Sequence, residues 1–225
     1  MTKAEIGLIG LGVMGSGLAL NMAEKGYPVA VYNRTSSRTG AFFGAAGELR
    51  GNVVPCGTIK ELVEQIKPPR PILLMVQAGK AVDEQITELR QLLSEGDIII
   101  DGGNANFRDT MRRIDELDGT GITFIGMGVS GGAVGARHGP SIMVGGPKDT
   151  YSRIEPILTA IAARYETEPC NAWLGEGGAG HFVKTVHNGI EYADMQMIAE
   201  IYGVLRDGFA MPAAEIGKLF ARWNK

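Results

Sequence analysis

Four polar side chains recur at helical spacing in the segment 177–192, GGAGHFVKTVHNGIEY. Lys184, His187, Asn188 and Glu191 stand at positions i, i+3, i+4 and i+7, which lie on one face of an α-helix. A lysine and a carboxylate on one face can act as proton acceptor and proton donor toward one small substrate. The amine must be uncharged when it accepts a proton, and burial favours that form.

A solvated surface is the simpler interpretation of these residues, because most charged helix faces contact only water. The stripe also holds a histidine and an asparagine, and Tyr192 flanks it. Glycines precede the helix, and glycine allows the backbone to approach a ligand closely. We therefore predict that this face belongs to a site.

The composition excludes several classes of protein. Of the 225 residues, 44% are apolar and 21% charged, as in soluble globular proteins. A net charge of −3 provides no broad positive field, so we expect no nucleic-acid partner. No segment resembles a membrane span or a secretory signal, which predicts a cytoplasmic protein without membrane contact. Cys56 and Cys170 have neither CxxC nor metal-ligand spacing, so we interpret them as structural thiols and expect no metal site.

A glycine-rich turn follows the first apolar run, Ile6 to Ile9. It reads Gly10-Leu11-Gly12-Val13-Met14-Gly15 and leads into a helical pattern that ends at Gly26. In GxGxxG the glycines serve the tight turn, the approach to a pyrophosphate and the close packing of helix on strand. A turn without a ligand is the alternative. A second apolar run at 27–32 completes a βαβ unit and favours a dinucleotide site.

The second strand ends in Asn33, Arg34 and Thr35, where an NAD site would carry an acidic residue. No carboxylate is present there. A guanidinium can bind a 2′-phosphate bidentately, so the loop predicts NADP rather than NAD. An exposed loop arginine without a ligand is the alternative.

Strands, loops and helices then alternate up to about residue 175. Strands are predicted at 72–76, 97–101 and 122–125, and helices at 38–45, 58–67, 81–93, 108–117 and 149–163. This pattern is α/β: a doubly wound, mostly parallel Rossmann sheet, whose ligands lie beyond the carboxyl ends of the strands. The predicted crevice residues are Val76, Gln77, Ala78 and Asn104.

The stretch 127–135, MGVSGGAVG, is interpreted as a glycine-rich loop. Its backbone and the Ser130 hydroxyl offer donors to a carboxylate or a phosphate. A loop without a ligand is the alternative.

Two domains are predicted. Residues 1–176 would form the NADP-binding Rossmann-like domain, and residues 177–225 would begin a helical substrate and dimerisation domain. In the second part, helices are expected up to about Arg206 and from Ala213 to Trp223. Because no further element follows for them to pack against, we interpret the helical domain as truncated.

Six motifs together resemble the 6-phosphogluconate dehydrogenase family, over essentially the whole chain. They are GLGVMG at 10–15, NRT at 33–35, DGGN at 101–104, GVSGGAVGAR at 128–137, PSIMVGG at 140–146 and GAGHFVKTVHNGIEY at 178–192. The resemblance implies oxidative decarboxylation of 6-phosphogluconate to ribulose 5-phosphate, with NADP taking the hydride, in a homodimer.

The resemblance also implies roles for individual residues. Lys184 would be the general base on the C3 hydroxyl, and Glu191 the acid that protonates the enediol after carbon dioxide leaves. Further positions match substrate contacts of the family: Asn104, Ser130, Gly131, Gly132, His187, Asn188 and Tyr192.

Two features depart from the family pattern. The family's chains continue well past this length and contribute further basic residues that hold the substrate phosphate, including a tail from the partner subunit. We therefore expect the substrate site of this chain to be incomplete and the chain alone not to turn over 6-phosphogluconate efficiently. Gln77 stands where relatives often carry lysine.

Two other functions fit part of the pattern. Another β-hydroxyacid dehydrogenase, such as a 3-hydroxyisobutyrate-type enzyme, would share the glycine fingerprint, the SGG motif and the helix lysine, but Glu191, Tyr192 and the NRT loop argue against it. A non-catalytic NADP-binding module would need the NRT loop but not Lys184 with Glu191.

Overall fold

The computed structural model of the chain describes residues 3–225. They fall into two compact units, the first ending at Lys184 and the second running from Thr185 to Lys225. Helix α8 (Ala179–Gly203) contributes its first residues to the first unit and the rest to the second.

The first unit is built on an eight-stranded sheet within the described residues, in the order β10-β7-β6-β5-β4-β1-β2-β3. Strands β1 to β6 are parallel and follow the 3-2-1-4-5-6 order of a Rossmann sheet. Strand β7 runs antiparallel to β6, and β10 is parallel to β7. The strands are β1 (Ile6–Ile9), β2 (Val29–Tyr32), β3 (Val53–Pro55), β4 (Pro71–Leu74), β5 (Ile98–Asp101), β6 (Thr123–Ser130), β7 (Ser141–Gly145) and β10 (Asn171–Gly175).

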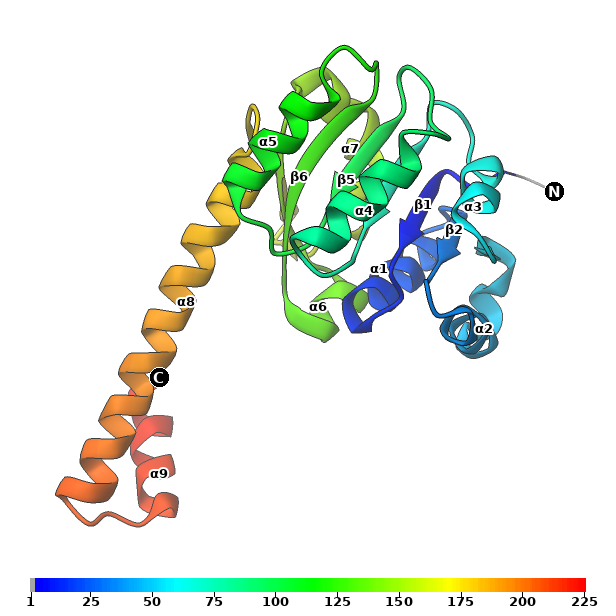
Figure 1. Cartoon of the computed structure of the whole chain (residues 1–225). Coiled ribbons are helices and arrows are strands. Elements are labelled where there is room, and N and C mark those ends of the chain that lie inside the picture. The colour runs from blue at the N-terminus through cyan, green and yellow to red at the C-terminus, as the bar shows by residue number, and fades with distance from the viewer. Residues whose placement is uncertain (1–2) are drawn as a thin grey trace. The chain divides into compact units, whose positions relative to one another are not determined.

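Helices cover both faces of this sheet, and Figure 1 shows α4 and α5 on one side and α7 on the other. One core cluster joins the sheet to α1 (Val13–Glu24), α2 (Ser36–Ala45), α6 (Gly132–His138) and α7 (Lys148–Ile161). The opposite cluster joins it to α3 (Ile59–Gln65), α4 (Lys80–Leu89) and α5 (Phe107–Leu117). Because side chains alternate along a strand, Ile98 and Ile100 enter the first cluster and Ile99 the second.

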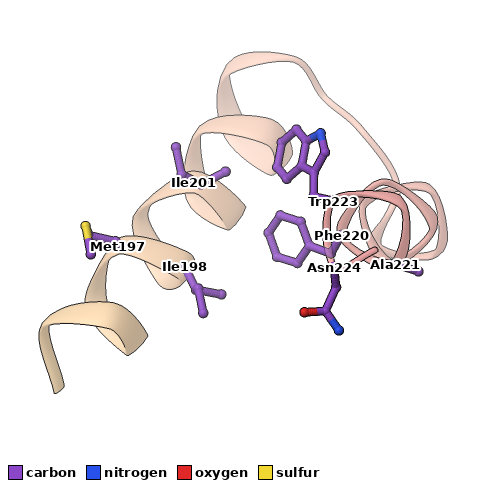
Figure 2. Close-up of a pocket in the computed structure, with 7 residues that line it drawn as sticks. All are labelled: Met197, Ile198, Ile201, Phe220, Ala221, Trp223 and Asn224. Carbon is purple, nitrogen blue, oxygen red and sulfur yellow. The ribbon is translucent and has the colours of Figure 1, made fainter. Parts of the chain in front are cut away.

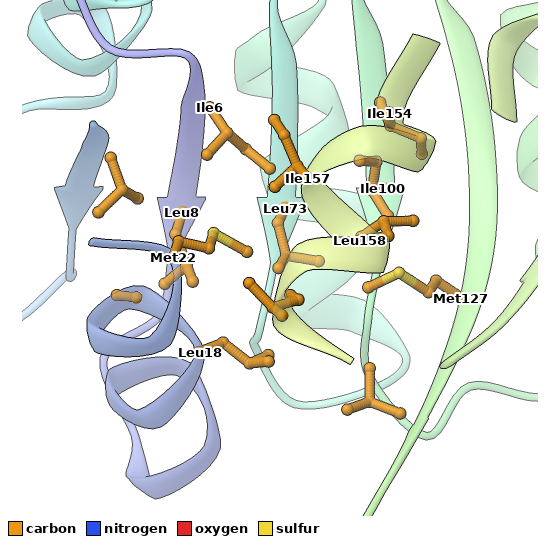
Figure 3. Packing of buried hydrophobic residues seen from close by; sticks show 14 of the residues in the cluster. Ile6, Leu8, Leu18, Met22, Leu73, Ile100, Met127, Ile154, Ile157 and Leu158 are labelled. Carbon is orange, nitrogen blue, oxygen red and sulfur yellow. The ribbon is translucent and has the colours of Figure 1, made fainter. Parts of the chain in front are cut away.

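The first cluster is the larger core, shown in Figure 3. Leu18 and Met22 of α1 and Leu158 of α7 pack there with Leu73 of β4 and Ile100 of β5, and all five side chains are at most 1% exposed. Burial of one such side chain contributes about 1.5–3 kcal/mol relative to exposure. The core thus fixes the strands whose carboxyl ends carry the predicted ligand loops.

Smaller elements complete the two units. The first unit also contains a 3-10 helix, Gly47–Asn52, and an antiparallel pair, β8 (Arg164–Tyr165) and β9 (Glu168–Pro169). In the second unit α8 runs into a π-helical turn, Val204–Gly208, and α9 (Ala213–Trp223) follows. No helix within residues 3–225 combines the length and the apolar run that crossing a bilayer requires.

The predicted fold class is confirmed: a doubly wound, mostly parallel sheet is followed by a helical region. The prediction of a loop at 127–135 is wrong. Strand β6 continues through Ser130, and α6 begins at Gly132. A Cβ at Gly128 would lie 2.6 Å from the Cβ of Lys184, so the glycine serves close packing of α8 on the strand rather than a loop.

Strand β10 was not predicted from the sequence. It reads NAWLG, and its residues alternate between half-buried and exposed, as at a sheet edge. Its pairing with β7 depends on tertiary contacts that a five-residue pattern does not encode.

Helix α6 packs against α1 and is joined to it by a hydrogen bond and an ion pair. Asn21 of α1 is 1% exposed, and its amide donates to the carbonyl oxygens of Ala136 (3.3 Å) and Ile161 (3.0 Å). A Cβ on Gly17 would approach the Cβ of Ala136 to 3.1 Å, so α1 and α6 pack with little space between them. Arg137 and Glu24 form an ion pair between the same two helices. The start of α6 is therefore held relative to the glycine fingerprint at the start of α1.

We expect Asn21→Leu to destabilise the protein by about 2–6 kcal/mol, because two buried carbonyls lose their donor at roughly 1–3 kcal/mol each. Urea denaturation followed by circular dichroism measures the loss. Asn104→Ala is the control, since Asn104 is exposed in a loop and its replacement should leave the midpoint unchanged. Equal midpoints for Asn21→Leu and the unmodified protein would contradict this account of the α1–α6 contact.

Candidate functional site

The loops after β1, β4 and β5 meet at the carboxyl edge of the sheet. A Cβ on Gly10 would touch the carbonyl oxygen of Met75 and would lie 3.2 Å from the side chain of Val76. A Cβ on Gly103 would lie 3.2 Å from the carbonyl oxygen of Val76. Strands β1 and β4 are neighbours although α1, β2 and β3 separate them in sequence, so this edge contains the switch point where such folds bind ligands.

The glycine fingerprint has the geometry of a phosphate loop. A Cβ on Gly15 would collide with the carbonyl oxygen of Gly10, whereas a Cβ on Gly12 would meet no protein atom within 4 Å. The space beside Gly12 is thus open to a ligand. Helix α1 begins at Val13 and carries no acidic residue in its first turn, so its N-terminus attracts an anion without competition.

The 33–35 loop is tied to the fingerprint by Asn33. The Asn33 side-chain oxygen accepts a hydrogen bond from the Leu11 amide at 3.0 Å, and its amide group donates to the carbonyl of Thr35 at 3.2 Å. Arg34 and Thr35 are exposed, and within residues 3–225 Arg34 has no carboxylate partner. Asn33 therefore shapes the loop, while Arg34 and Thr35 are available to a ligand.

The remaining residues predicted for the crevice differ in burial. Val76 is half-buried, whereas Gln77, Ala78 and Asn104 are exposed. The Gly103 amide just before Asn104 donates to a carboxylate oxygen of Asp101 at 3.0 Å, which fixes the turn after β5. The first unit therefore brings the 10–15, 33–35, 76–78 and 104 segments to one edge.

Ser130 ends β6 and is half-buried, and Gly131 and Gly132 are exposed at the start of α6. Gly131 (φ 130°) and Gly132 (φ 58°) adopt backbone conformations that side chains disfavour. The bend between β6 and α6 requires both glycines.

Lys184 is buried, with 8% of its surface exposed. It lies on β6 beside Gly128, two residues before Ser130. A lysine is seldom buried to this extent unless it has a partner or a role. The simpler interpretation, a solvated lysine on a helix face, does not describe this residue.

A group of buried polar residues was missed by the sequence analysis. His181 (1% exposed) contacts Thr110 of α5, with 2.7 Å between the hydroxyl oxygen and Nδ1. Burial lowers the pKa of His181, and the nearby Asp101 carboxylate opposes that effect only in part. The signal was available in the sequence, since His181 stands one helical turn before Lys184.

Arg113 of α5 is fully buried and joins two of the ligand loops. Its guanidinium donates to Asp83 at 2.8 Å, to the carbonyl of Gly79 at 3.1 Å and to Asp101 at 3.4 Å. Desolvation alone would raise the pKa of Asp83, but hydrogen bonds from Arg113 and Arg112 outweigh it and lower that pKa. Arg113 thereby connects the start of α4 with the end of β5.

In the second unit, His187, Asn188 and Glu191 form a small polar group of their own. The Nδ1 atom of His187 lies 3.2 Å from the Asn188 side-chain oxygen and 3.7 Å from a carboxylate oxygen of Glu191. Tyr192 is 68% exposed. These residues follow Lys184 along the same helix at the spacing noted in the sequence.

The second unit also contains an apolar groove of about 520 Å³ between the end of α8 and α9. Figure 2 shows the rings of Phe220 and Trp223 directed from α9 toward the part of α8 that carries Ile198 and Ile201. No titratable side chain lines this groove, so it offers no acid, base or phosphate-binding group.

Comparison with known proteins covers both units. The family model for the NAD binding domain of 6-phosphogluconate dehydrogenase matches residues 5–175, and the model for the C-terminal domain of 6-phosphogluconate dehydrogenase matches residues 180–225.

Two curated relatives come from Bacillus subtilis. An NADP(+)-dependent decarboxylating 6-phosphogluconate dehydrogenase is 51% identical over all of this chain and 48% of its own length. An NAD(+)-dependent one is 52% identical over 98% of this chain and 47% of its own. The chain thus spans about half the length of these relatives.

A solved structure supports the same relationship. The 6-phosphogluconate dehydrogenase of Plasmodium falciparum, studied in its apo form, with NADP+ and with 6-phosphogluconate, superposes with a TM-score of 0.92 at 42% identity. The match covers 98% of this chain and 47% of that one. With a family model matched across its nucleotide-binding fold and another across its helical part, the chain belongs to the 6-phosphogluconate dehydrogenase family.

Proposed function

We propose that the protein oxidises and decarboxylates 6-phosphogluconate to ribulose 5-phosphate, with NADP as hydride acceptor. The burial of Lys184 against Gly128, two residues before the Ser130 turn, is the observation that carries this proposal. A buried amine close to a turn with exposed backbone amides suits proton abstraction from a bound polyol acid.

NADP supplies an acceptor for the hydride that leaves C3. The residues present fit it: the open space at Gly12 and the N-terminus of α1 suit the pyrophosphate. Arg34, exposed and without a carboxylate partner, suits the 2′-phosphate. The 33–35 loop contains no acidic residue, and an acidic residue there would repel the 2′-phosphate of NADP and bind the ribose of NAD.

The side chains of α8 supply the proton transfers in this proposal. Lys184 accepts the proton of the C3 hydroxyl, and Glu191 protonates the enediol after carbon dioxide leaves. Ser130, Gly131, Gly132 and Asn104 bind the substrate, together with His187, Asn188 and Tyr192. Two titratable groups with different surroundings, one buried and one exposed, suit the separate roles of base and acid.

Lys184→Ala should lower turnover of 6-phosphogluconate by about 10²–10⁴-fold, the usual contribution of a general base, and should leave NADP affinity unchanged. Formation of NADPH by a purified full-length protein that contains this chain measures the turnover, and calorimetric titration measures the NADP affinity. Lys60→Ala, at an exposed position on α3, is the matched control and should behave like the unmodified protein.

Three results would count against the proposal. Near-normal turnover by Lys184→Ala would remove this residue from the mechanism. NADP binding without any turnover of 6-phosphogluconate by a full-length protein that contains this chain would support a non-catalytic cofactor-binding module. Turnover of 3-hydroxyisobutyrate in preference to 6-phosphogluconate would support the other β-hydroxyacid dehydrogenases.

Arg34→Ala should weaken NADP binding by roughly one to two orders of magnitude, because a charge-assisted hydrogen bond contributes about 1.5–3 kcal/mol. NAD affinity should barely change, since NAD lacks the 2′-phosphate. Calorimetric titration of the unmodified protein and of Arg34→Ala with NADP and with NAD tests this. Arg90→Ala, at the end of α4, is the control for loss of one surface arginine. Equal NADP affinity in Arg34→Ala and the unmodified protein would show that other residues recognise the 2′-phosphate.

A further inference from the structure

Helices α5 and α8 meet through side chains to which the proposed reaction gives no role, and two of these side chains are buried and polar. Phe107 and Phe182 pack edge to face, with ring centroids 5.3 Å apart, and the Gly178 amide lies 3.2 Å from the sulfur of Met111. Between these contacts, Thr110 and His181 form a hydrogen bond at 2.7 Å, and the two residues are 0% and 1% exposed. Thr110 and His181 are far more buried than Phe182 and Met111, so this polar pair needs its own explanation.

The position of His181 relative to Lys184 supplies one. On α8 the two residues are one helical turn apart. The glycines of β6 that lie against His181 and Lys184 are two residues apart. A Cβ on Gly126 would lie 2.7 Å from Nδ1 of His181, and a Cβ on Gly128 would lie 2.6 Å from the Cβ of Lys184. His181 and Lys184 therefore rest on the same face of β6, one after the other.

Thr110 determines where His181 can lie. Its hydroxyl is the side-chain partner of Nδ1, and its methyl group would lie 2.7 Å from a Cβ on Gly126, so threonine and histidine share the space above this glycine. A rotation of α8 by a fraction of a turn, or a shift along its axis, would break the hydrogen bond. The same movement would displace Lys184 from Gly128.

The same helix α5 also holds the loop that carries Asn104. Arg113, one turn after Thr110, binds Asp101, and Asp101 accepts the Gly103 amide before Asn104. Two consecutive turns of α5 thus contact the segments that carry the proposed base and a proposed substrate ligand.

We propose that His181, held by Thr110, is a positioning residue that fixes Lys184 against β6. This inference rests on the role of Lys184 in the proposed function. His181 does not transfer a proton in this proposal; it fixes the register of the α8 turn that carries the base.

The test removes only the hydroxyl. Thr110→Val keeps the volume of the side chain. It should lower kcat by about 10–100-fold, because displacing a base by up to about one ångström costs that much rate. KM and NADP affinity should stay nearly unchanged. Thr110→Ser restores the hydroxyl and should restore kcat to within a few-fold. Thr87→Val is the matched control. The Thr87 hydroxyl donates to the Asp83 carbonyl, as the Thr110 hydroxyl donates to the Asn106 carbonyl, but Thr87 is exposed on α4.

A second measurement does not depend on turnover. The rate at which an amine-reactive acylating reagent labels Lys184, read by mass spectrometry of its peptide, should rise about tenfold in Thr110→Val, because a buried amine held less firmly is reached more often. Thr110→Ser and Thr87→Val should label at the rate of the unmodified protein.

Unchanged kcat and unchanged labelling in Thr110→Val would overturn the proposal, as would a loss of kcat that Thr110→Ser does not rescue. If a full-length protein that contains this chain does not turn over 6-phosphogluconate, the proposed function fails. The labelling rates would still decide whether Thr110 and His181 position Lys184.

Discussion

The start of helix α8 lies so close to the sheet that the contact leaves room only for glycine, without a side chain. A Cβ on Gly180 would meet the carbonyl oxygens of Gly126 and Met143, and a Cβ on Gly145 would lie 2.6 Å from the Gly180 amide. These contacts join α8 to β6 and β7 at once. The burial of His181 and Lys184 depends on this approach, because any larger side chain at the contact would move the helix outward.

The same constraint explains why polar groups are found in this buried region. A helix packed on backbone rather than on side chains brings its own side chains close to carbonyl and amide groups, where a polar atom can find partners. His181 pairs with Thr110, and Arg113 satisfies two carboxylates and a carbonyl. A hydrogen-bonded polar network of this kind favours one arrangement, whereas an apolar contact tolerates small rotations. The position of Lys184 is thus fixed by packing of side chains to which the proposed function gives no substrate contact.

Much of the fold followed from local patterns in the sequence. The apolar strands β1, β4 and β5 are buried on both faces and flanked by glycine or proline, and such runs are recognised without tertiary information. The glycines of the segment 127–135 resemble a turn signal, but Gly128 allows close packing of Lys184, a residue more than fifty positions away in sequence. Strand β10 and the Thr110–His181 contact were missed for a related reason. Each depends on residues that are brought together only when the sheet has formed.

In the proposed function, cofactor preference depends on exposed loop residues rather than on the buried core. Two relatives from one organism, about equally similar to this chain, differ in the cofactor they use, so overall identity does not decide the preference. The 33–35 loop combines one residue fixed by the fold, Asn33, with two exposed residues, Arg34 and Thr35, that contribute nothing to the core. Substitutions at exposed positions usually alter stability by less than about 0.5 kcal/mol, whereas loss of one charge-assisted hydrogen bond alters affinity by about 1.5–3 kcal/mol. A loop anchored in this way can change its cofactor without changing the sheet, because recognition and stability depend on different side chains.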